Sequence, residues 1–446
     1  MRIIETKNID NNQLRKILTK PAFDEVMLGD GAKKRIKESF GKELSAVEVV
    51  ETIVNDIRSN GDNAVKKYIK LIDNVDFANT SLEVTTAEYE KALSLVDSKV
   101  VAAIKKAVSN VKKYHEEQKP KSWITYRDHG SILGQSCIPL EIVGIYVPGG
   151  TASYPSSVIM NAVPAAVAGV KDIIMVVPSD KNGEVNPYVL VAAKEAGVSR
   201  IFKVGGAQGI AALAFGTETI PKVDKITGPG NIFVTLAKKA VYGHCDIDML
   251  AGPSEILIVA DQTADPAYIA ADMLSQAEHD VLASSILLTD NIKLAQKVTA
   301  ELEVQLAKLP RAEIAKLALE KNGLIIVADN IKECMELANV SAPEHLEILT
   351  ADPFNLLPLV RHAGAVFLGA YSPEPLGDYF AGPNHVLPTG GTARFYSVLN
   401  VETFMKRTSI ISYTKEALQA VQDDIISLAE AEGLTAHANA IRVRGE

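Results

Sequence analysis

The sequence is poor in cysteine, has no long uninterrupted hydrophobic run and contains no dense block of basic residues. Its 446 residues include only three cysteines: Cys137, Cys245 and Cys334. An odd, sparse set argues against a disulfide framework and indicates a reducing compartment. The most apolar segment, 158–170, is interrupted by Asn161 and Pro164 and is too short to span a bilayer. Residues 1–7 lack the apolar stretch of a signal peptide, so we expect a cytoplasmic protein with no membrane partner.

The acidic charge balance bears on the partners of the protein. There are 46 lysines and arginines against 55 aspartates and glutamates, which gives a formal net charge of −9. Such a surface repels phosphate backbones unless basic residues are segregated into a patch, and the sequence shows no such block. We therefore expect no nucleic-acid partner, which leaves small molecules as the ligands to consider.

Residues 1–140 are predicted to form a mainly helical N-terminal region. Within it, Ser45 and Glu48 have the spacing of a capping box and precede apolar residues at helical intervals. Gly61 is the expected end of that helix, because glycine readily adopts the left-handed conformation that closes helices.

From residue 141 onward, short apolar runs alternate with helix-length segments. Runs of this kind are typical of strands in parallel sheets that are buried on both faces. They occur at 143–147, 173–177, 201–204, 256–260, 286–289, 324–328, 346–349 and 365–368. The pattern predicts an α/β fold with two Rossmann-like parallel-sheet units, 141–250 and 251–378. The C-terminal residues, 379–446, are predicted to form a loop and a helical tail, with one helix over 414–432.

Three glycine-rich turns follow predicted strands in the first unit. They are Pro148-Gly149-Gly150, Gly205-Gly206-Ala207-Gln208-Gly209 and Gly228-Pro229-Gly230-Asn231. Glycine at a strand end lets a ligand approach the backbone, and the helix N-terminus that follows favours phosphate. Asp224 stands about as far beyond the second turn as a ribose-binding acid would. The set indicates a nucleotide or another anionic ligand, although one such turn alone is more often purely structural.

Candidate acid–base residues occur in three segments. Glu344 and His345 lead into a predicted strand, where the imidazole can abstract a proton and the carboxylate can activate water. Two further sets stand later in the chain: Asp378 with His385, and Glu432 with His437. Each set has a plainer interpretation as solvated surface groups, which is what most neighbouring acids and histidines are.

Two other patterns admit metal or nucleophile chemistry. Gln276 and His279 lie on one face of a predicted helix, but glutamine is a rare zinc ligand and the spacing alone favours a surface histidine. His244 and Cys245 are neighbours on a predicted strand, where adjacent side chains point to opposite faces. Cys245 and Cys137 are candidate nucleophiles, but buried and inert cysteine is the favoured interpretation for both.

Taken together, these segments resemble the histidinol dehydrogenase family over most of the chain beyond residue 140. The resemblance rests on 143–150 (VGIYVPGG), 204–208 (VGGAQ), 226–231 (ITGPGN), 248–255 (DMLAGPSE), 274–280 (LSQAEHD), 342–346 (APEHL), 382–389 (GPNHVLPT) and 434–437 (LTAH). Ordered motifs of this length and number are not expected by chance. The helical N-terminal region is less diagnostic.

The resemblance implies a zinc enzyme with an aldehyde-dehydrogenase-like arrangement of its two Rossmann-like units. The family's zinc ligands match Gln276, His279, Asp378 and His437, which overturns the surface interpretation. Its acid–base pair matches Glu344 and His345, and its NAD contacts match Tyr146, Gln208 and Asn231. Its substrate-binding positions match Ser254, Gln276, His279, His345, Asp378, Glu432 and His437, with His385 beside them. One zinc ion per subunit and a homodimer with exchanged tails are also implied, so that His437 serves the partner's site.

The activity implied by the resemblance is oxidation of L-histidinol through histidinaldehyde to L-histidine with two NAD, the final step of histidine biosynthesis. A relative that oxidises another polar alcohol, such as a sulfonated diol, is the alternative. A zinc hydrolase, with Glu344 activating water, would leave the three glycine turns without a purpose. A non-catalytic metal-binding assembly protein would make His345 dispensable.

Overall fold

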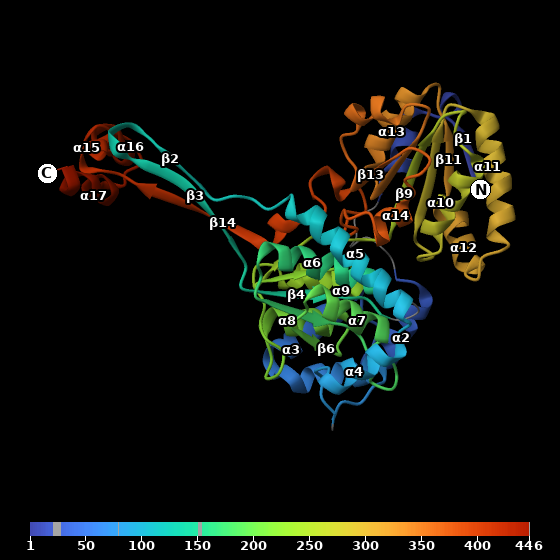
Figure 1. Cartoon of the computed structure of the whole chain (residues 1–446), viewed down its shortest axis with the longest axis horizontal. Helices are drawn as coiled ribbons and strands as arrows, with labels where there is room; N and C mark the ends of the chain where they lie inside the picture. Colours follow the sequence, from blue (N-terminus) through green and yellow to red (C-terminus); the bar gives the residue numbers. More distant parts are fainter. Residues whose placement is uncertain (21–27, 79, 150–153, 446) are drawn as a thin grey trace.

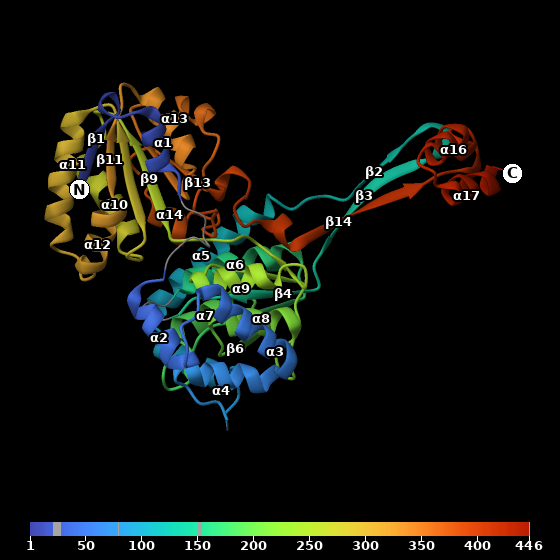
Figure 2. The same ribbon diagram turned by 180° about the vertical axis from the view of Figure 1, so that it is seen from behind.

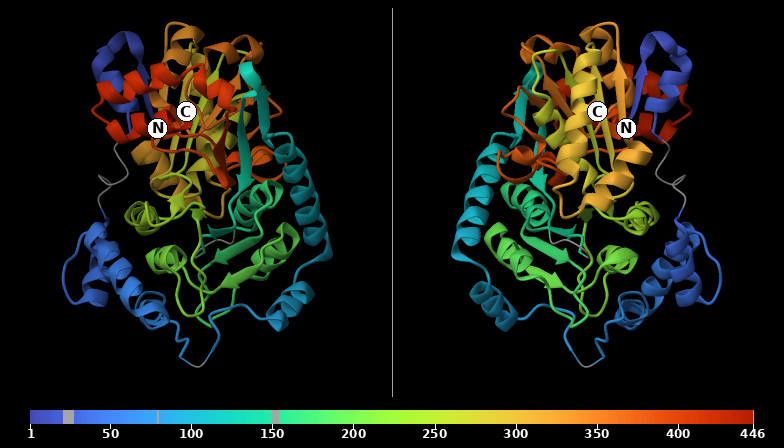
Figure 3. Two further views of the ribbon diagram at one scale, coloured as in Figure 1. Left: turned by 90° about the vertical axis from the view of Figure 1, so that its left-hand side faces the viewer. Right: turned by 90° about the vertical axis from the view of Figure 1, so that its right-hand side faces the viewer.

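The computed structural model describes residues 1–20, 28–78, 80–149 and 154–445, which form two α/β units and a long projecting arm (Figure 1). The two units lie one above the other, and the arm leaves the molecule to one side (Figures 2 and 3). The predicted fold class, α/β with two Rossmann-like parallel sheets, is confirmed. Among the described residues, no helix is long and apolar enough to cross a lipid bilayer.

The first unit is built on a five-stranded parallel sheet in the order β6-β5-β4-β7-β8. Its strands are β4 (Ile142–Tyr146), β5 (Asp172–Val176), β6 (Arg200–Phe202), β7 (Lys225–Thr227) and β8 (Asp246–Ile247). The connecting helices are α6 (Pro155–Ala168), α7 (Pro187–Ala196), α8 (Gly206–Phe215) and α9 (Ile232–Val241). The chain starts at β4, builds outward to β6 and then crosses back to β7. Such a reversal of strand order opens a crevice at the carboxyl ends of β4 and β7.

The N-terminal helices cover both faces of this sheet. They are α2 (Asp30–Phe40), α3 (Ala46–Tyr68), α4 (Thr86–Leu95) and α5 (Ser98–Glu116). The capping box of Ser45 and Glu48 is confirmed at the start of α3, which packs with α8 and α9 on one face. The expectation that Gly61 ends a helix is confirmed, because its φ of 50° and ψ of −133° are non-helical and separate two helical stretches within Ala46–Tyr68. The second stretch runs on to Tyr68, and its apolar side chains remain buried beyond the kink.

The second unit has a six-stranded parallel sheet in the order β1-β11-β10-β9-β12-β13. Its strands are β1 (Arg2–Glu5), β9 (Glu255–Ala260), β10 (Ser284–Thr289), β11 (Leu324–Val327), β12 (His345–Leu349) and β13 (Ala365–Leu368). Its helices are α1 (Asn11–Leu18), α10 (Pro266–Ala277), α11 (Ile292–Leu306), α12 (Ala312–Asn322), α13 (Ile331–Ser341) and α14 (Glu374–Tyr379). The sequence pattern does not predict β1, because this edge strand is four residues long and its partner β11 lies far away in the sequence.

The segment 248–254 joins the two sheets. It leaves β8 at the carboxyl edge of the first sheet and enters β9 at the amino edge of the second sheet. These two edges are therefore tied together by one short connection, and residues at either edge can contribute to one site.

The arm consists of an antiparallel sheet and three terminal helices. The sheet has the order β14-β3-β2, and its strands are β2 (Trp123–Tyr126), β3 (Ile132–Pro139) and β14 (Met405–Ser412). The helices are α15 (Lys415–Gln419), α16 (Gln422–Ala431) and α17 (Thr435–Gly445). The prediction of a single helix over 414–432 is wrong, since the helix is interrupted between α15 and α16. The helices sit at the tip of the arm, remote from both units (Figures 1 and 2).

A buried ion pair holds the turn that follows β7. The Lys238 ammonium on α9 pairs with the Asp248 carboxylate, and the two side chains are 3% and 1% exposed. Lys238 Nζ donates to Gly228 O at 3.0 Å, and Gly228 N donates to Asp248 Oδ2 at 2.8 Å. The pair thereby fixes both polar groups of Gly228.

Replacing Lys238 with methionine is expected to destabilise the fold by about 3–5 kcal/mol, because it leaves a buried carboxylate without its partner. Equilibrium urea denaturation measures the loss. Lys37→Met is the matched control, since its pair with Glu43 is exposed to solvent and is expected to contribute little to stability. Equal stability of the two variants would contradict the role given to Lys238.

Candidate active site

Glu344 and His345 meet the start of strand β9 at the amino edge of the second sheet. β12 pairs with β9 so that His345 lies beside Ile256, next to Glu255. Glu255 N donates to Glu344 Oε2 at 2.9 Å, and His345 Nδ1 lies 2.9 Å from Glu255 O. Both side chains are buried, so the two neighbours are held by one residue of the adjacent strand.

The hydrogen bond to Glu255 sets the protonation of the His345 ring. A carbonyl oxygen only accepts, so Nδ1 must carry the proton and Nε2 of the neutral ring must hold a lone pair. Burial lowers the pKa of His345 to about 3, which keeps the ring neutral. Nε2 makes no hydrogen bond within the part of the chain that the structure describes, and it lies 3.8 Å from Asp378 Oδ1. The geometry gives a base whose free nitrogen faces a carboxylate.

A set of metal-competent groups surrounds Nε2. His345, Glu374 and Asp378 each offer a ligand atom, and these atoms lie within 4.8 Å of one another. Burial raises the pKa of Asp378 to about 6 and that of Glu374 to about 8. Buried carboxylates are costly unless a positive charge compensates them, so the donor set fits a divalent cation.

Gln276 supplies a second indication of a ligand. It is fully buried at the end of α10, yet neither Oε1 nor Nε2 has a hydrogen-bond partner among the described residues. Gln276 is therefore a core residue, and His279, which the spacing alone would place on the surface, is half-buried. The end of α10 lies against α14, because Ser275 Oγ donates to Glu374 Oε2 at 3.2 Å. An amide oxygen left unsatisfied in this position is suited to a metal ion or to a bound substrate.

The remaining residues predicted in this unit lie in the same neighbourhood. His279 stands just beyond the last residue of α10 rather than within the helix, near enough to interact electrostatically with His345 and Glu374. His385 Nδ1 lies 3.1 Å from Asp378 O, and burial lowers its pKa to about 4. Ser254 directly precedes β9, so it too lies at this edge.

Glu432 and His437 do not join this cluster within one chain. Glu432 ends α16 and His437 lies in α17, both at the tip of the arm (Figure 1). α10 and α14 lie in the body of the second unit, far from that tip in both views of the molecule (Figures 1 and 2). A contribution of these two residues to the site therefore requires another copy of the chain.

The three predicted nucleotide contacts lie at the carboxyl edge of the first sheet. Tyr146 ends β4, and its hydroxyl accepts from Gly206 N at 3.3 Å, at the start of α8. Gln208 is buried in the first turn of α8, whereas Asn231 caps α9 and is exposed. Gly228 has a φ of 118°, and a Cβ there would lie 2.2 Å from Tyr146 O. The turn can thus press against the end of β4 only because residue 228 is glycine.

Three expectations from the sequence need correction or limitation. Asp224 is not a ribose acid, because it precedes β7 at the amino edge and its Oδ2 accepts from the backbone N–H groups of residues 141 and 142. Burial raises the pKa of Cys245 to about 12, which confirms an inert thiol. Cys137 is half-buried in β3 of the arm, so the prediction of burial is wrong for it. Gly150 of the first glycine turn lies outside the described residues.

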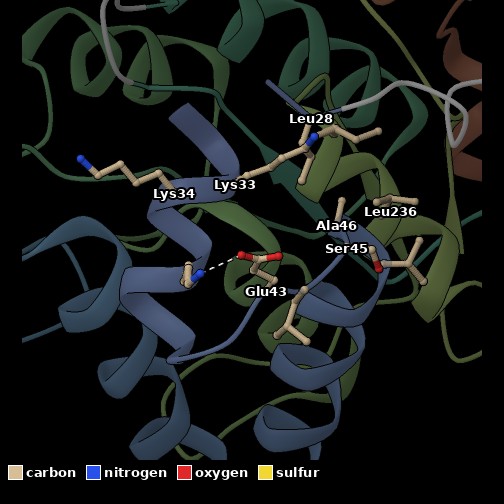
Figure 4. Close-up of a pocket in the computed structure, with 11 residues that line it drawn as sticks. Leu28, Lys33, Lys34, Glu43, Ser45, Ala46 and Leu236 are labelled. Carbon is tan, nitrogen blue, oxygen red and sulfur yellow. Dashed lines mark hydrogen bonds and ion pairs between the residues drawn. The ribbon is translucent and has the colours of Figure 1, made fainter. Parts of the chain in front are cut away.

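A pocket of about 720 Å³ opens elsewhere on the first unit, between α2, the start of α3 and α9 (Figure 4). Leu28, Leu44 and Ile232 contribute apolar walls, and Lys33 and Lys34 lie at its rim. Ile232 follows Asn231, so the pocket adjoins the start of α9. None of the acid–base or metal-competent residues lines it, and the chemistry therefore lies with the buried groups at the sheet edge.

The fold and the two edges define an α/β protein of two Rossmann-like units, with a buried Glu344–His345 pair and a metal-competent cluster at one edge and glycine-rich turns at the other. The family model described as histidinol dehydrogenase matches residues 37–445. The histidinol dehydrogenase of Heliobacterium mobile is 53% identical over 97% of this chain and 99% of its own length. That of Clostridium acetobutylicum is 54% identical over 93% and 96%. The chain belongs to the histidinol dehydrogenase family, a family of oxidoreductases that act at the final step of histidine biosynthesis.

A solved structure supports the same conclusion. The crystal structure of histidinol dehydrogenase from Elizabethkingia anophelis matches with a TM-score of 0.91 at 38% identity, and the match covers 100% of this chain and 98% of that one. The whole architecture, including the arm, is therefore shared with that relative.

Two buried acids at the site escape the sequence analysis. Glu255 neighbours the predicted Ser254, but nothing in sequence shows that its backbone holds both Glu344 and His345. Glu374 stands four residues before Asp378, and that spacing on the short helix α14 is the only signal that could have revealed it.

Asp378 belongs to two candidate sets of zinc ligands. The structure groups it with His345 and Glu374. The resemblance groups it with Gln276, His279 and His437. We expect Asp378→Asn to weaken zinc binding by about 10- to 100-fold or more, because it removes a charged ligand from either set. Competition with a chromophoric chelator measures the affinity. Glu336→Gln, an exposed change on α13, is the control and should leave zinc affinity unchanged. An unaltered affinity in Asp378→Asn would place the metal elsewhere.

Proposed function

We propose that the protein oxidises L-histidinol through histidinaldehyde to L-histidine, with two NAD and one zinc ion per subunit. The observation that carries the proposal is the neutral His345 ring, whose free Nε2 faces buried metal-competent carboxylates at an edge tied to the nucleotide-binding edge. Family membership supplies the reaction, and the local geometry supplies residues able to perform it. We also place the enzyme in the cytoplasm.

His345 is the proposed base in both oxidation steps. Its Nδ1 is committed to Glu255 O, so Nε2 is the atom that takes the proton from the substrate hydroxyl. Withdrawal of that proton allows hydride to leave the carbinol carbon. The low pKa set by burial means that the proton does not rest on the ring and must pass onward to solvent or to a nearby carboxylate.

Glu344 is the proposed base for the hydration step between the two oxidations. Its Oε2 accepts the Glu255 N–H at 2.9 Å, which holds the carboxyl group in one orientation. Burial and the neighbouring acids raise the pKa of Glu344 well above its ordinary value, which suits it to accept a proton from water. The hydrated aldehyde then presents a hydroxyl to His345 again. No cysteine is needed, in keeping with the inert Cys245.

The metal and cofactor positions follow from the donor chemistry. Gln276, His279 and Asp378 would hold zinc, with His437 donated by a second copy of the chain. His345 Nε2 cannot ligate a metal and accept a proton at once, which favours this set over one that includes His345. When bound, zinc would supply positive charge to orient the substrate, and NAD would accept the hydride. Tyr146, Gln208 and Asn231 would bind NAD.

Substrate contacts are proposed at the same edge. The residues are Ser254, Gln276, His279, His345, Asp378 and His385 from one copy, with Glu432 and His437 from another. A charged carboxylate and imidazole from the second copy suit a substrate that carries both an amine and an imidazole. This is the reason for preferring histidinol to a sulfonated diol.

The proposed homodimer rests on the exposed surface of the arm. Trp123, Ile124 and Tyr126 of β2 and Ile411 of β14 are 51%, 56%, 73% and 73% exposed. A projecting sheet with so much apolar surface requires a cover, and a second copy also brings the tip of the arm to a site. Exchange of arms would satisfy both requirements.

Zinc-replete protein is expected to form two NADH per histidinol and to be far slower with sulfonated diols, as initial rates will show.

His345→Asn should lower kcat by about 10²- to 10⁴-fold, because it removes the base. Glu344→Gln should slow the second oxidation more than the first, so that NADH formed per histidinol falls from two towards one.

His244→Asn is the matched control for these variants, since His244 is exposed on the first unit and should retain full activity. Absence of NADH formation with histidinol would overturn the named substrate. Wild-type rates in His345→Asn would overturn the assignment of the base.

Mixing two inactive variants tests whether the arm acts on another copy. A dimer of His345→Asn with His437→Ala has one site with both residues intact if the arms are exchanged. Unfolding and refolding the mixture should then restore roughly a quarter of wild-type activity, from random pairing into dimers with one intact site of two. Size-exclusion chromatography checks that dimers form. Failure of the mixture to regain activity would overturn the proposed contribution of His437 to the site of another copy.

A further inference from the structure

Asp73 places a carboxylate at the nucleotide-binding edge that the assigned contacts do not include. It is the last residue of the π-helical turn Ile69–Asp73, which continues α3. Asn74 follows with a φ of 57° and turns the chain away from the sheet. α3 packs along α8 and α9 (Figure 1), and the hydrogen bond between Gln208 and Asp73 places the end of this turn beside the first turn of α8.

Two of the proposed NAD contacts converge on Asp73. Gln208 Nε2 donates to Asp73 Oδ2 at 3.2 Å. Burial raises the pKa of Tyr146 to about 12 and the nearby Asp73 charge adds to this, while the Tyr146 hydroxyl accepts from Gly206 N. The Gly206 backbone lies so close that a Cβ there would be 2.6 Å from Gln208 Oε1. Asp73, Gln208, Tyr146 and the first turn of α8 therefore form one polar cluster.

The burial of Asp73 indicates that its carboxylate is not an ordinary surface group. Burial raises its pKa to about 6, and the Gln208 hydrogen bond lowers it only in part. A carboxylate kept at a sheet edge under this penalty is a good acceptor for hydroxyl donors of a ligand. Among the hydrogen bonds of the described residues, only Oδ2 of Asp73 receives a donor from another side chain.

The other acids near this edge are committed elsewhere. Nucleotide-binding sheets of this kind commonly place a ribose-binding acid after the second strand. Here β5 is followed by Val177 and Pro178, and the Pro178 ring packs against Gly149 and Gly205. Asp180 accepts from the backbone of its own loop, at residues 182 and 184. Asp224 lies at the opposite edge of the sheet, as described above.

We infer that Asp73 binds the adenosine ribose hydroxyls of NAD and excludes the 2′-phosphate of NADP. The inference rests on the assignment of NAD to Tyr146 and Gln208 under the proposed function. The carboxylate would accept hydrogen bonds from the ribose hydroxyls, whereas a phosphate in the same place would bring two negative charges together. Asp73 then supplies the specificity that Asp224 cannot supply.

Isothermal titration calorimetry of the zinc-loaded protein with NAD and with NADP tests the inference without turnover. Wild-type protein should bind NAD at least about tenfold more tightly than NADP, because a charged hydrogen bond is exchanged for a repulsion. Asp73→Asn, which keeps the size and the Gln208 contact, should weaken NAD binding by about three- to tenfold and bring the two affinities to within about threefold of each other.

Asp76→Asn is the matched control. It removes the same charge three residues later, from an exposed carboxylate that pairs with Lys70 at 2.6 Å, and should leave both affinities unchanged. Steady-state KM values for NAD should follow the calorimetric changes, while the KM for histidinol stays constant.

The outcomes separate this inference from the proposed function. Wild-type protein that binds neither nucleotide overturns the NAD assignment itself. Wild-type protein that binds NADP as tightly as NAD overturns the role of Asp73 without recourse to a variant. A folded Asp73→Asn protein with wild-type discrimination overturns it as well.

Discussion

The desolvation of several carboxylates in one place is the constraint on which the rest of the second unit depends. Glu255, Glu344, Glu347, Glu374 and Asp378 all lie within or beside the amino edge of the sheet, and burial raises the pKa of each. Each would cost several kcal/mol if ionised without compensation. A neutral histidine, an unsatisfied glutamine and a set of ligand atoms at metal distance are the groups expected around such charge. Within the described residues Lys20 offsets part of the charge at Glu255, and a bound cation would compensate the other carboxylates.

The arrangement of the two sheets explains how a cation and a nucleotide come to serve one reaction. Each sheet reverses its strand order, but the proposed nucleotide site uses the carboxyl edge of the first sheet, whereas the acid–base site uses the amino edge of the second. The segment 248–254 joins those edges, and Asp248 at its start fixes the Gly228 turn. The same segment ends at Ser254, beside Glu255 and Glu344. One connection thus positions groups of both sites.

The sequence predicted what is encoded locally and missed what depends on distant pairing. Strands β4 to β6 and β9 to β13, the capping box at Ser45 and the grouping of Asp378 with His345 follow from short apolar runs and motifs. The strand β1, the arm sheet and the holding role of Glu255 could not be predicted, because each depends on a partner far away in the chain. Gly61 shows the same local encoding, because its left-handed backbone separates two helical stretches at the position where the sequence predicts a helix end.

The placement of β1 has a consequence for how the chain can be handled. Residues 2–5 provide the outer edge of the second sheet and satisfy the backbone groups of β11. Without them, β11 would present a row of unpaired N–H and C=O groups flanked by apolar side chains, which is a template for intermolecular strand addition. β1 replaces that edge with a strand of only four residues that carries Arg2 and Glu5 at its ends, and a short, charged edge disfavours strand addition. Affinity tags fused next to residues 2–5, or truncations that remove them, are therefore expected to lower solubility before they lower enzymatic activity.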